Sequence, residues 1–149
     1  MRAVIQRVSR AEVRTSGRVA GAIGPGILLL LGIGRDDTRA DAENILKKTW
    51  ELRIFPDDEG KMNRSVVEAG GSLLVVSQFT LFGDCRKGRR PSYSDAMEPA
   101  AAQRLYDEFM RLAAAGPVPV AGGEFQAMMD VELVNDGPVT LLLDSRKQF

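Results

Sequence analysis

The 149-residue chain contains no histidine, only one cysteine and one tryptophan, and no long apolar run. Without histidine there is no Ser-His-Asp or Cys-His relay, no HExxH zinc helix and no imidazole to carry protons near neutral pH. Cys85 alone can form neither an intramolecular disulfide nor a zinc cage. We therefore expect no metal and no cofactor, and an enzyme of this composition must move its protons another way.

Hydrophobic residues make up 44% of the chain, and a chain of this length can bury about 68–70% of its unfolded surface without staples. We expect one domain, residues 1–149. The longest apolar stretch, Ile27 to Leu31, is far below the ~20 residues that a membrane helix needs. Charges interrupt the N-terminal apolar residues too early for a signal peptide. The sequence thus indicates a cytoplasmic protein that has no membrane partner.

Lys and Arg number 20, as do Asp and Glu, but the charge is unevenly distributed. Residues 1–20 hold five arginines against one glutamate, and a second basic segment contains Arg86, Lys87, Arg89 and Arg90. If the fold joins these segments, they could bind phosphate groups. The alternative, ordinary solvated charges, is equally consistent with the pattern. The neutral total argues against a protein that coats DNA.

Hydrophobic periodicity predicts both strands and helices. Alternating or unbroken apolar residues predict strands over 3–14, 18–23, 27–31, 73–76, 129–134 and 139–143. The unbroken run at 27–31 is typical of a central strand covered on both faces. Apolar stripes predict one helix capped by Thr38, with Trp50 in the core, and a second helix that begins near Pro99. This mixture indicates an α/β or α+β fold with a mixed sheet.

Two glycine-rich segments fail as nucleotide-binding loops. The segment that starts at Gly32 lacks the third glycine of a dinucleotide loop, because Asp37 stands there. The segment 83–89 lacks the Lys-Ser/Thr pair of a P-loop. Its Cys85 has basic neighbours but no base or resolving cysteine, so we interpret it as a small loop residue.

The segment Ser77-Gln78-Phe79-Thr80 directly follows a predicted buried strand. Sheets of α/β proteins often place their sites at such strand ends. The alternative, which the sequence alone slightly favours, is that the hydroxyls of Ser77 and Thr80 cap the strand through local backbone bonds. As a catalytic cluster it lacks an obvious base, so it would act by positioning and by donors aimed at a developing oxyanion.

The segment Asn135-Asp136-Gly137-Pro138 separates the last two predicted strands. Asp-Gly between apolar runs normally indicates a tight hairpin, but Pro138 removes an N–H where the returning strand would begin. A Gly-Pro bond can adopt the cis form. A rigid turn is the simpler interpretation.

With these two signatures the chain resembles the D-aminoacyl-tRNA deacylases. The resemblance runs from end to end, through Met1–Val8, Leu52–Phe55, Gly60–Asn63, Ser77–Leu81, Arg86–Ser92 and Asn135–Thr140. It implies a single α/β domain with two main helices and a mixed sheet curved into a half-barrel. It further implies a cytoplasmic homodimer that cleaves the ester between a D-amino acid, or glycine mischarged on tRNA-Ala, and the terminal adenosine of tRNA, while sparing L-aminoacyl-tRNA.

The resemblance also implies roles for particular residues. It places Ser77, Gln78, Phe79 and Thr80 in the catalytic pocket, with Gln78 holding the adenosine and the N–H groups around Phe79 and Thr80 facing the scissile carbonyl. Gly137–Pro138 would be a cis peptide that enters the partner subunit's pocket and receives the substrate's amino group. The remaining implied residues are Arg7 and Asn135 beside that peptide, Ala127 and Met129 in the pocket wall, and Arg86, Lys87, Arg89 and Arg90 against the tRNA.

The mechanism that the family implies accounts for the missing histidine, because the tRNA's own ribose 2′-hydroxyl handles the proton. An older scheme makes the Thr80 hydroxyl a nucleophile, which we disfavour since no base adjoins Thr80 in the motif. The sequence departs from the family pattern at Gln126, where glycine is usual, and at Cys85, where threonine is commoner.

Two other functions stay open at this point. One is a non-catalytic dimeric binder of RNA ends that uses the basic loop, although such a module would not need both polar signatures. The other is a metabolic hydrolase of small esters. Turnover of D-Tyr-tRNA but not L-Tyr-tRNA, binding without turnover, and cleavage of small esters without tRNA would separate the three.

Overall fold

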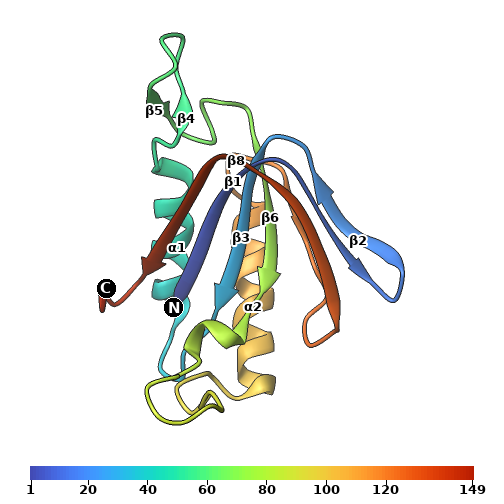
Figure 1. The fold of residues 1–149 in the computed structure, drawn as a ribbon, viewed down its shortest axis with the longest axis vertical. Helices are drawn as coiled ribbons and strands as arrows, with labels where there is room; N and C mark the ends of the chain where they lie inside the picture. The colour runs from blue at the N-terminus through green and yellow to red at the C-terminus, as the bar shows by residue number, and fades with distance from the viewer.

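The computed structural model describes residues 1–149, and its sheet is built around the long strand β1 (Arg2–Thr15). The first half of β1 pairs antiparallel with β3 (Gly26–Gly32), and its second half pairs antiparallel with β2 (Arg18–Ile23). Along its other edge β1 pairs with β8 (Met129–Asp144). Figure 1 shows that β1 and β8 arch over together, so the sheet is bent into a half-barrel.

Two parallel strands complete this sheet. β6 (Ser72–Ser77) pairs with β3, and β7 (Val120–Gly122) pairs with β6. The resulting strand order is β2-β1-β3-β6-β7. β2 and β3 share one edge of β1, and β8 occupies the other edge. The mixed half-barrel sheet predicted for this chain is thereby confirmed.

The two main helices, α1 (Arg39–Glu51) and α2 (Pro99–Ala114), lie behind the sheet in Figure 1. At the start of α1, Thr38 and Asp41 form the predicted capping box, in which each side chain satisfies a backbone N–H of the other. At the start of α2, the Glu98 carboxylate accepts from two backbone N–H groups of the first turn. No helix in the structure is both long and apolar enough to cross a bilayer.

The sequence prediction contained none of the four short elements, which are β7, two further short strands and a 3₁₀ helix. β4 (Phe55–Pro56) and β5 (Met62–Arg64) form a two-stranded arm that projects from the upper end of the molecule (Figure 1). A 3₁₀ helix, η1 (Phe79–Phe82), follows β6 at the lower end. This helix carries two residues of the polar signature described above.

Alternate residues of β3 contribute to two hydrophobic cores. Ile27 and Leu29 belong to the larger core, which includes residues of both helices. Leu28 belongs to a smaller core that also contains Leu74 and Val13 and receives side chains of β2 and β8. Both faces of β3 are therefore covered, as the unbroken apolar run predicts.

The prediction of two terminal strands joined by a turn is wrong, because β8 is one strand. Its N-terminal and C-terminal parts pair with the same strand β1 in the same antiparallel direction. Val8 faces Asn135 and Gln6 faces Thr140, so Arg7 alone lies opposite the four residues 136–139. The segment 136–139 is thus a bulge that leaves the ladder, and β8 continues beyond it without reversing.

Tyr106 of α2 gives a pH dependence to the packing of this helix on β6. Its hydroxyl donates to the Val75 carbonyl oxygen at 3.2 Å, and only 4% of the residue is exposed. Burial raises the pKa of Tyr106 to about 12, and the nearby Asp107 carboxylate acts in the same direction. Because the neutral phenol is favoured in the folded state, its contribution is complete below about pH 10 and is lost as the pH rises toward 12.

We expect Tyr106→Phe to flatten the fall in the free energy of unfolding between pH 9.5 and 11.5. The loss attributable to Tyr106 between these two pH values is about 1.5–2 kcal/mol. Urea unfolding of the parent and of Tyr106→Phe across this pH range measures the difference. Parallel curves of unfolding free energy against pH would show that Tyr106 titrates alike in the folded and unfolded states.

Candidate active site

The polar signature at the end of β6 begins a sharp change in backbone direction. Ser77 is the last residue of β6 and pairs with Leu31 of β3. The next N–H, that of Gln78, still donates to the Leu31 carbonyl oxygen at 2.7 Å. Gln78 then precedes η1, so the parallel pairing of β3 and β6 fixes the point at which the signature leaves the sheet.

Phe79 and Thr80 are the first two residues of η1, and this position frees their backbone N–H groups. Leu81 is the first residue of the turn to donate within it, to the Gln78 carbonyl oxygen at 3.2 Å. Neither the Phe79 nor the Thr80 N–H donates to an acceptor in the protein, as is normal for the first turn of a helix. Two adjacent N–H groups of this kind can stabilise an oxyanion.

No side chain of the signature is placed beside a base. The Thr80 hydroxyl accepts from the amide nitrogen of Gln78, which is a donor. The one carboxylate among the lining residues belongs to Glu98, which lies 3.1 and 3.2 Å from the Ala100 and Ala101 nitrogens as the cap of α2. The arrangement therefore supplies donors and no proton acceptor to a substrate.

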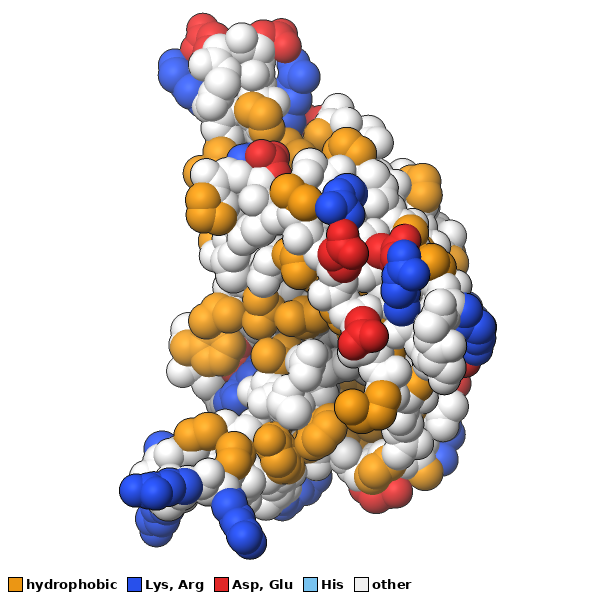
Figure 2. Space-filling model, turned by 45° about the vertical axis from the view of Figure 1, so that its right-hand side comes forward, with side chains coloured by type: hydrophobic (Ala, Val, Ile, Leu, Met, Phe, Trp, Pro, Cys, Tyr) orange, Lys and Arg blue, Asp and Glu red, His pale blue; other side chains and the backbone are white.

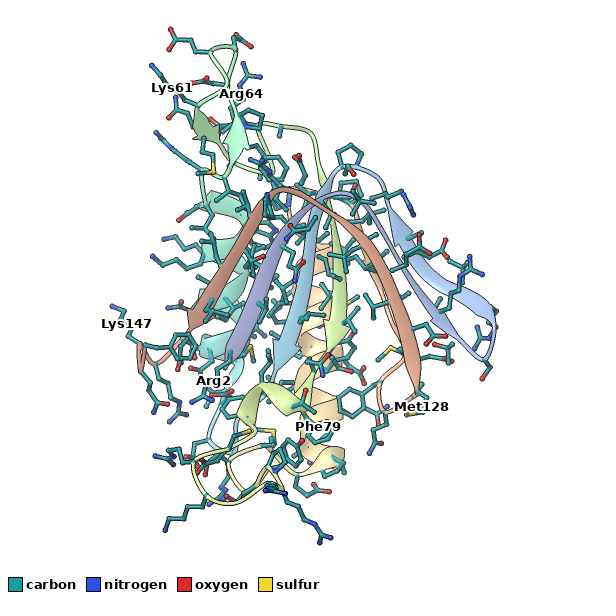
Figure 3. All side chains as sticks on the ribbon, viewed as in Figure 1. Arg2, Lys61, Arg64, Phe79, Met128 and Lys147 are labelled. Carbon is teal, nitrogen blue, oxygen red and sulfur yellow. The ribbon has the colours of Figure 1, made fainter.

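The signature borders a cavity of about 890 Å³ that is lined mainly by apolar side chains. Ala127 and Met129, both predicted for the pocket wall, line it, as do Phe79 and Met128, which Figure 3 shows at the lower end of the sheet. A mostly apolar pocket with a few polar groups at one side is typical of a small-molecule or nucleoside site. Sequence reasoning assigned no site role to further lining residues: Tyr93, Met97, Glu98 and Phe125.

Gln126 also lines this cavity, in an unusual backbone conformation. Its φ is +60°, in the left-handed region that glycine adopts freely and that costs other residues about 1–2 kcal/mol. Gln126 therefore has the backbone conformation of a glycine, the residue that the family pattern has at this position. Ala127 keeps its place in the wall, and its N–H donates to the Glu124 carbonyl oxygen at 3.3 Å.

The second signature lies in the bulge of β8, where the Gly137–Pro138 peptide bond is cis. Arg7 holds this bulge from the opposite strand: its Nε lies 3.2 Å from the Asp136 carbonyl oxygen and 3.0 Å from the Asp136 carboxylate. The Arg7 guanidinium also donates to the Ile54 carbonyl oxygen, and its side chain is 10% exposed. One nearly buried arginine thus ties the bulge to the base of the β4–β5 arm.

Asn135 fastens the near side of the bulge. One end of its amide lies 2.8 Å from the Arg7 carbonyl oxygen and 3.1 Å from the Val139 carbonyl oxygen, which identifies that end as the nitrogen. The other end, the oxygen, then accepts from the Thr140 hydroxyl at 3.1 Å. Both ends of the segment 136–139 are consequently fixed by one side chain.

Within one chain the two signatures lie far apart. Strand pairing puts Ser77 level with Ala3 of β1, and Asn135 level with Val8. Five residues along β1 correspond to about 17 Å, and the three strand spacings from β6 to β8 add about 14 Å across the sheet. A single chain therefore cannot bring its own Gly137–Pro138 to its own Ser77.

The basic loop beside the pocket carries three unpaired cations. Arg86 binds the Asp84 carboxylate through two contacts of 2.8 and 2.7 Å, and this pairing holds the pKa of Asp84 well below its usual range. Lys87, Arg89 and Arg90 have no carboxylate within ion-pair distance. Figure 2 shows Lys and Arg side chains projecting from this lower end of the molecule.

The other basic segment, residues 1–20, is not available in the same way. Each of its five arginines lies within ion-pair distance of a carboxylate, the partners being Asp144, Asp136, Glu132, Glu12 and Glu124. The structure therefore leaves the loop at 86–90 as the place where the chain presents unpaired positive charge beside the pocket.

Comparisons with known proteins agree with this description. A family model described as D-Tyr-tRNA(Tyr) deacylase matches residues 4–144. The D-aminoacyl-tRNA deacylases of Desulforudis audaxviator (strain MP104C) and Syntrophobacter fumaroxidans (strain DSM 10017 / MPOB) are each 60% identical over 149 residues, with all of both chains covered.

Solved structures share the fold. The c-Myc DNA Unwinding Element Binding Protein matches with a TM-score of 0.92 and 40% identity, covering 97% of this chain and 98% of that one. A probable eukaryotic D-amino acid tRNA deacylase matches with a TM-score of 0.81 and 17% identity, covering 95% and 97%, which shows the fold alone.

The fold, the pocket and these relatives define an enzyme that hydrolyses carboxylic ester bonds. The chain belongs to the D-Tyr-tRNA(Tyr) deacylase family, which confirms the resemblance seen in its sequence.

Proposed function

We propose that this chain hydrolyses the ester between a D-amino acid and the 3′-terminal adenosine of tRNA in the cytoplasm, and releases free D-amino acid and tRNA. The observation that carries the proposal is the pair of unsatisfied N–H groups, on Phe79 and Thr80, at the edge of a mainly apolar cavity that is large enough to admit a nucleoside. The family match and the names of the relatives point to the same substrate class.

In the proposed reaction a water oxygen attacks the ester carbonyl carbon, and the carbonyl oxygen takes up negative charge. The N–H groups of Phe79 and Thr80 stabilise this oxyanion, while Gln78 holds the adenosine. The bond from carbon to the ribose 3′-oxygen then breaks, and a proton from the water passes to that oxygen. The ribose 2′-hydroxyl, which adjoins the 3′-oxygen in the substrate itself, carries the proton.

The contacts of the protein groups support a mechanism in which the protein stabilises the oxyanion and the substrate carries the proton. The Thr80 hydroxyl faces an amide donor, so nothing in the protein prepares it to attack as a nucleophile. Both oxygens of Glu98 accept from the backbone of α2, which makes this carboxylate a helix cap. Ser77 is half-buried at the strand end, without a titratable neighbour in the signature.

A second copy of the chain completes the proposed site. The distance within one chain excludes its own Gly137–Pro138, so the bulge would enter the partner subunit's pocket. β8 pairs only with β1 and leaves its other edge open, and two large apolar residues of β8, Val134 and Leu142, are 42% and 62% exposed. An open strand edge with exposed apolar side chains is suited to covering by another copy.

This arrangement also gives a basis for chiral selection. If backbone carbonyls at Gly137–Pro138 receive the amino group and the N–H groups of Phe79 and Thr80 receive the ester, two directions remain at the α-carbon. A D side chain points toward open space, whereas an L side chain meets the Gly–Pro wall. Glycine, including glycine mischarged on tRNA-Ala, fits in either case, and the identity of a D side chain has little influence.

Removal of the unpaired loop cations is expected to weaken tRNA binding. The triple variant Lys87→Gln, Arg89→Gln, Arg90→Gln should raise KM for D-Tyr-tRNA about 10-fold at 0.1 M salt and leave kcat largely unchanged. Three lost phosphate contacts should reduce the slope of log KM against log salt by roughly 2. Steady-state kinetics from 50 to 300 mM KCl measures both quantities.

A matched control removes the same charge from another surface. The triple variant Arg39→Gln, Lys47→Gln, Lys48→Gln changes α1 and should leave the slope close to that of the parent. Equal slopes for the two triple variants would mean that net charge alone, and not the basic loop, governs binding.

Deacylation of D-Tyr-tRNA and L-Tyr-tRNA side by side tests the proposed function. Rapid loss of the D-ester with the L-ester intact is the expected result. Binding without turnover would make the chain an RNA-end binder, and cleavage of small esters without tRNA would make it a general esterase. Either result would overturn the proposal.

A further inference from the structure

Two aromatic side chains, Phe79 and Tyr93, lie exposed side by side at the mouth of the cavity. Phe79 is 58% exposed and Tyr93 is 38% exposed. Their ring centroids are 5.0 Å apart, and the ring planes meet at 66°, an edge-to-face contact. The chain has nine aromatic residues, and the exposure of two of them at one place leaves apolar ring surface open to a ligand.

The Tyr93 ring is held in a fixed position. A Cβ atom on Gly83 would lie 3.1 Å from Tyr93 Cε1, so the ring packs against bare backbone on that side. The Tyr93 carbonyl oxygen accepts from the Ala96 N–H at 3.0 Å, and Phe79 supports the ring edge. A ring that is already immobilised loses little conformational entropy when a planar ligand stacks on it.

Tyr93 also stands between the pocket and the basic loop. Ser92, the residue before it, closes the loop by exchanging two backbone hydrogen bonds with Asp84, of 2.8 and 3.0 Å. The unpaired cations Lys87, Arg89 and Arg90 lie within that loop, and Tyr93 itself lines the cavity. In Figure 3 the loop extends below Phe79, with its long basic side chains pointing away from the sheet.

An aromatic ring next to unpaired cations is the usual means of binding single-stranded nucleic acid, because the ring stacks on a base and the cations bind the backbone phosphates. A strand whose last nucleoside occupies the cavity must pass Tyr93 to bring its phosphates to the loop. We propose that Tyr93, supported by Phe79, stacks on the base of the unpaired nucleotide that precedes the terminal adenosine. This inference rests on the proposed function.

The occupant is therefore a nucleotide, defined by a planar base and an adjoining phosphate. The cations supply complementary charge for that phosphate, and the paired rings supply a surface that fits any base. Stacking of this kind tolerates any sequence, so the platform would increase affinity for every tRNA, which shares an unpaired 3′ end, without selecting among them.

The test combines two enzyme forms with two substrates. The enzymes are the parent and Tyr93→Ala. The substrates are a D-tyrosyl RNA minihelix with an unpaired 3′ end and the same minihelix with an abasic ribose at the penultimate position. We expect Tyr93→Ala to lower kcat/KM about 5- to 150-fold more with the intact minihelix than with the abasic one, mainly through KM. Any general effect of Tyr93 on the pocket cancels in this comparison.

Two further measurements complete the test. Tyr93→Phe keeps a stacking ring and should restore most of the lost kcat/KM, whereas Tyr93→Leu keeps apolar bulk and should not. Equal losses on the two minihelices, or no loss on either, would overturn the stacking platform. Hydrolysis of D-tyrosyl-adenosine by the parent reports the proposed function separately, because this substrate lacks the second nucleotide. If the parent hydrolyses neither D-tyrosyl-adenosine nor the minihelix, the proposed function itself is overturned.

Discussion

Phe79→Pro is expected to lower kcat for D-aminoacyl-tRNA hydrolysis by about 10²–10³-fold relative to Phe79→Ala, because it removes one of the two proposed oxyanion donors. Phe79 is the first residue of η1, a position where proline is favoured and where the lost N–H has no acceptor in the protein. The preceding residue, Gln78, already lies outside the helical region, with φ −144° and ψ 76°. The substitution is therefore compatible with the local backbone.

The alanine variant is the matched reference, because it loses the same ring and keeps the N–H. Single-turnover rates with D-Tyr-tRNA compare the two proteins, and circular dichroism confirms that both are folded. Similar rates for Phe79→Pro and Phe79→Ala would show that this N–H does not stabilise the transition state.

Gly137→Ala is expected to lower kcat/KM by about 100-fold or more. Gly137 has a φ of +119°, which an alanine adopts only with strain, and its Cβ would lie 2.9 Å from the Arg7 Nη2 and 2.8 Å from the Val139 Cγ2. The bulge must shift, and a displacement of about 1 Å in a group that positions the substrate costs about 100-fold in rate. Both pockets of the proposed dimer would be affected.

Gly17→Ala is the control for this variant. Gly17 also has a positive φ, of +77°, but a Cβ there would meet no atom within 4 Å. It should lose stability and keep the parent's kcat/KM. A Gly137→Ala enzyme that keeps full activity, with its dimer verified by size-exclusion chromatography, would contradict a role for the bulge in the site.

Sequence patterns were most informative where structure is set locally. The periodicity of 18–23 and the cap at Thr38 depend on nearby residues, and both elements appear at the predicted positions. The placement of Ser77 at a strand end followed from the buried run before it. The position of the first signature could thus be predicted from the sequence.

Features that depend on contacts between segments far apart in the chain could not be predicted from the sequence. Asp136-Gly137-Pro138 looks like a turn until β1 is known to pair with both parts of β8, which makes it a bulge. Tyr93 and Phe125 reach the pocket only because α2 and the loops around it pack beside β6. Their side chains carry no local pattern that marks a site, whereas the two polar signatures do.

The availability of charged side chains could not be predicted from the sequence either, because it depends on distant partners. The arginines of residues 1–20 gave an apparent basic segment, but their partners lie as far as 142 positions away, as in the pair of Arg2 with Asp144 at 3.7 Å. In the short loop at 86–90 only Arg86 forms an ion pair, with Asp84, so the other three cations of the loop stay unpaired. Sequence clusters of one sign are thus informative only when their partners are also known.

The lack of histidine has a structural counterpart in this site. The pocket offers backbone N–H groups, two side-chain amides and three hydroxyls, and its single carboxylate caps a helix. Such a set can orient an ester and stabilise an oxyanion, but it supplies no group to transfer a proton at neutral pH. The proposed chemistry therefore depends on a hydroxyl that the substrate brings.

That dependence can be measured with D-Tyr-tRNA whose 3′-terminal residue is 2′-deoxyadenosine. The substrate keeps the ester, the base and the phosphates and lacks only the hydroxyl proposed to carry the proton. We predict that single-turnover hydrolysis falls by at least 100-fold while binding of the tRNA is retained. Hydrolysis at the rate of the ordinary substrate would contradict the account and place the proton transfer on the protein.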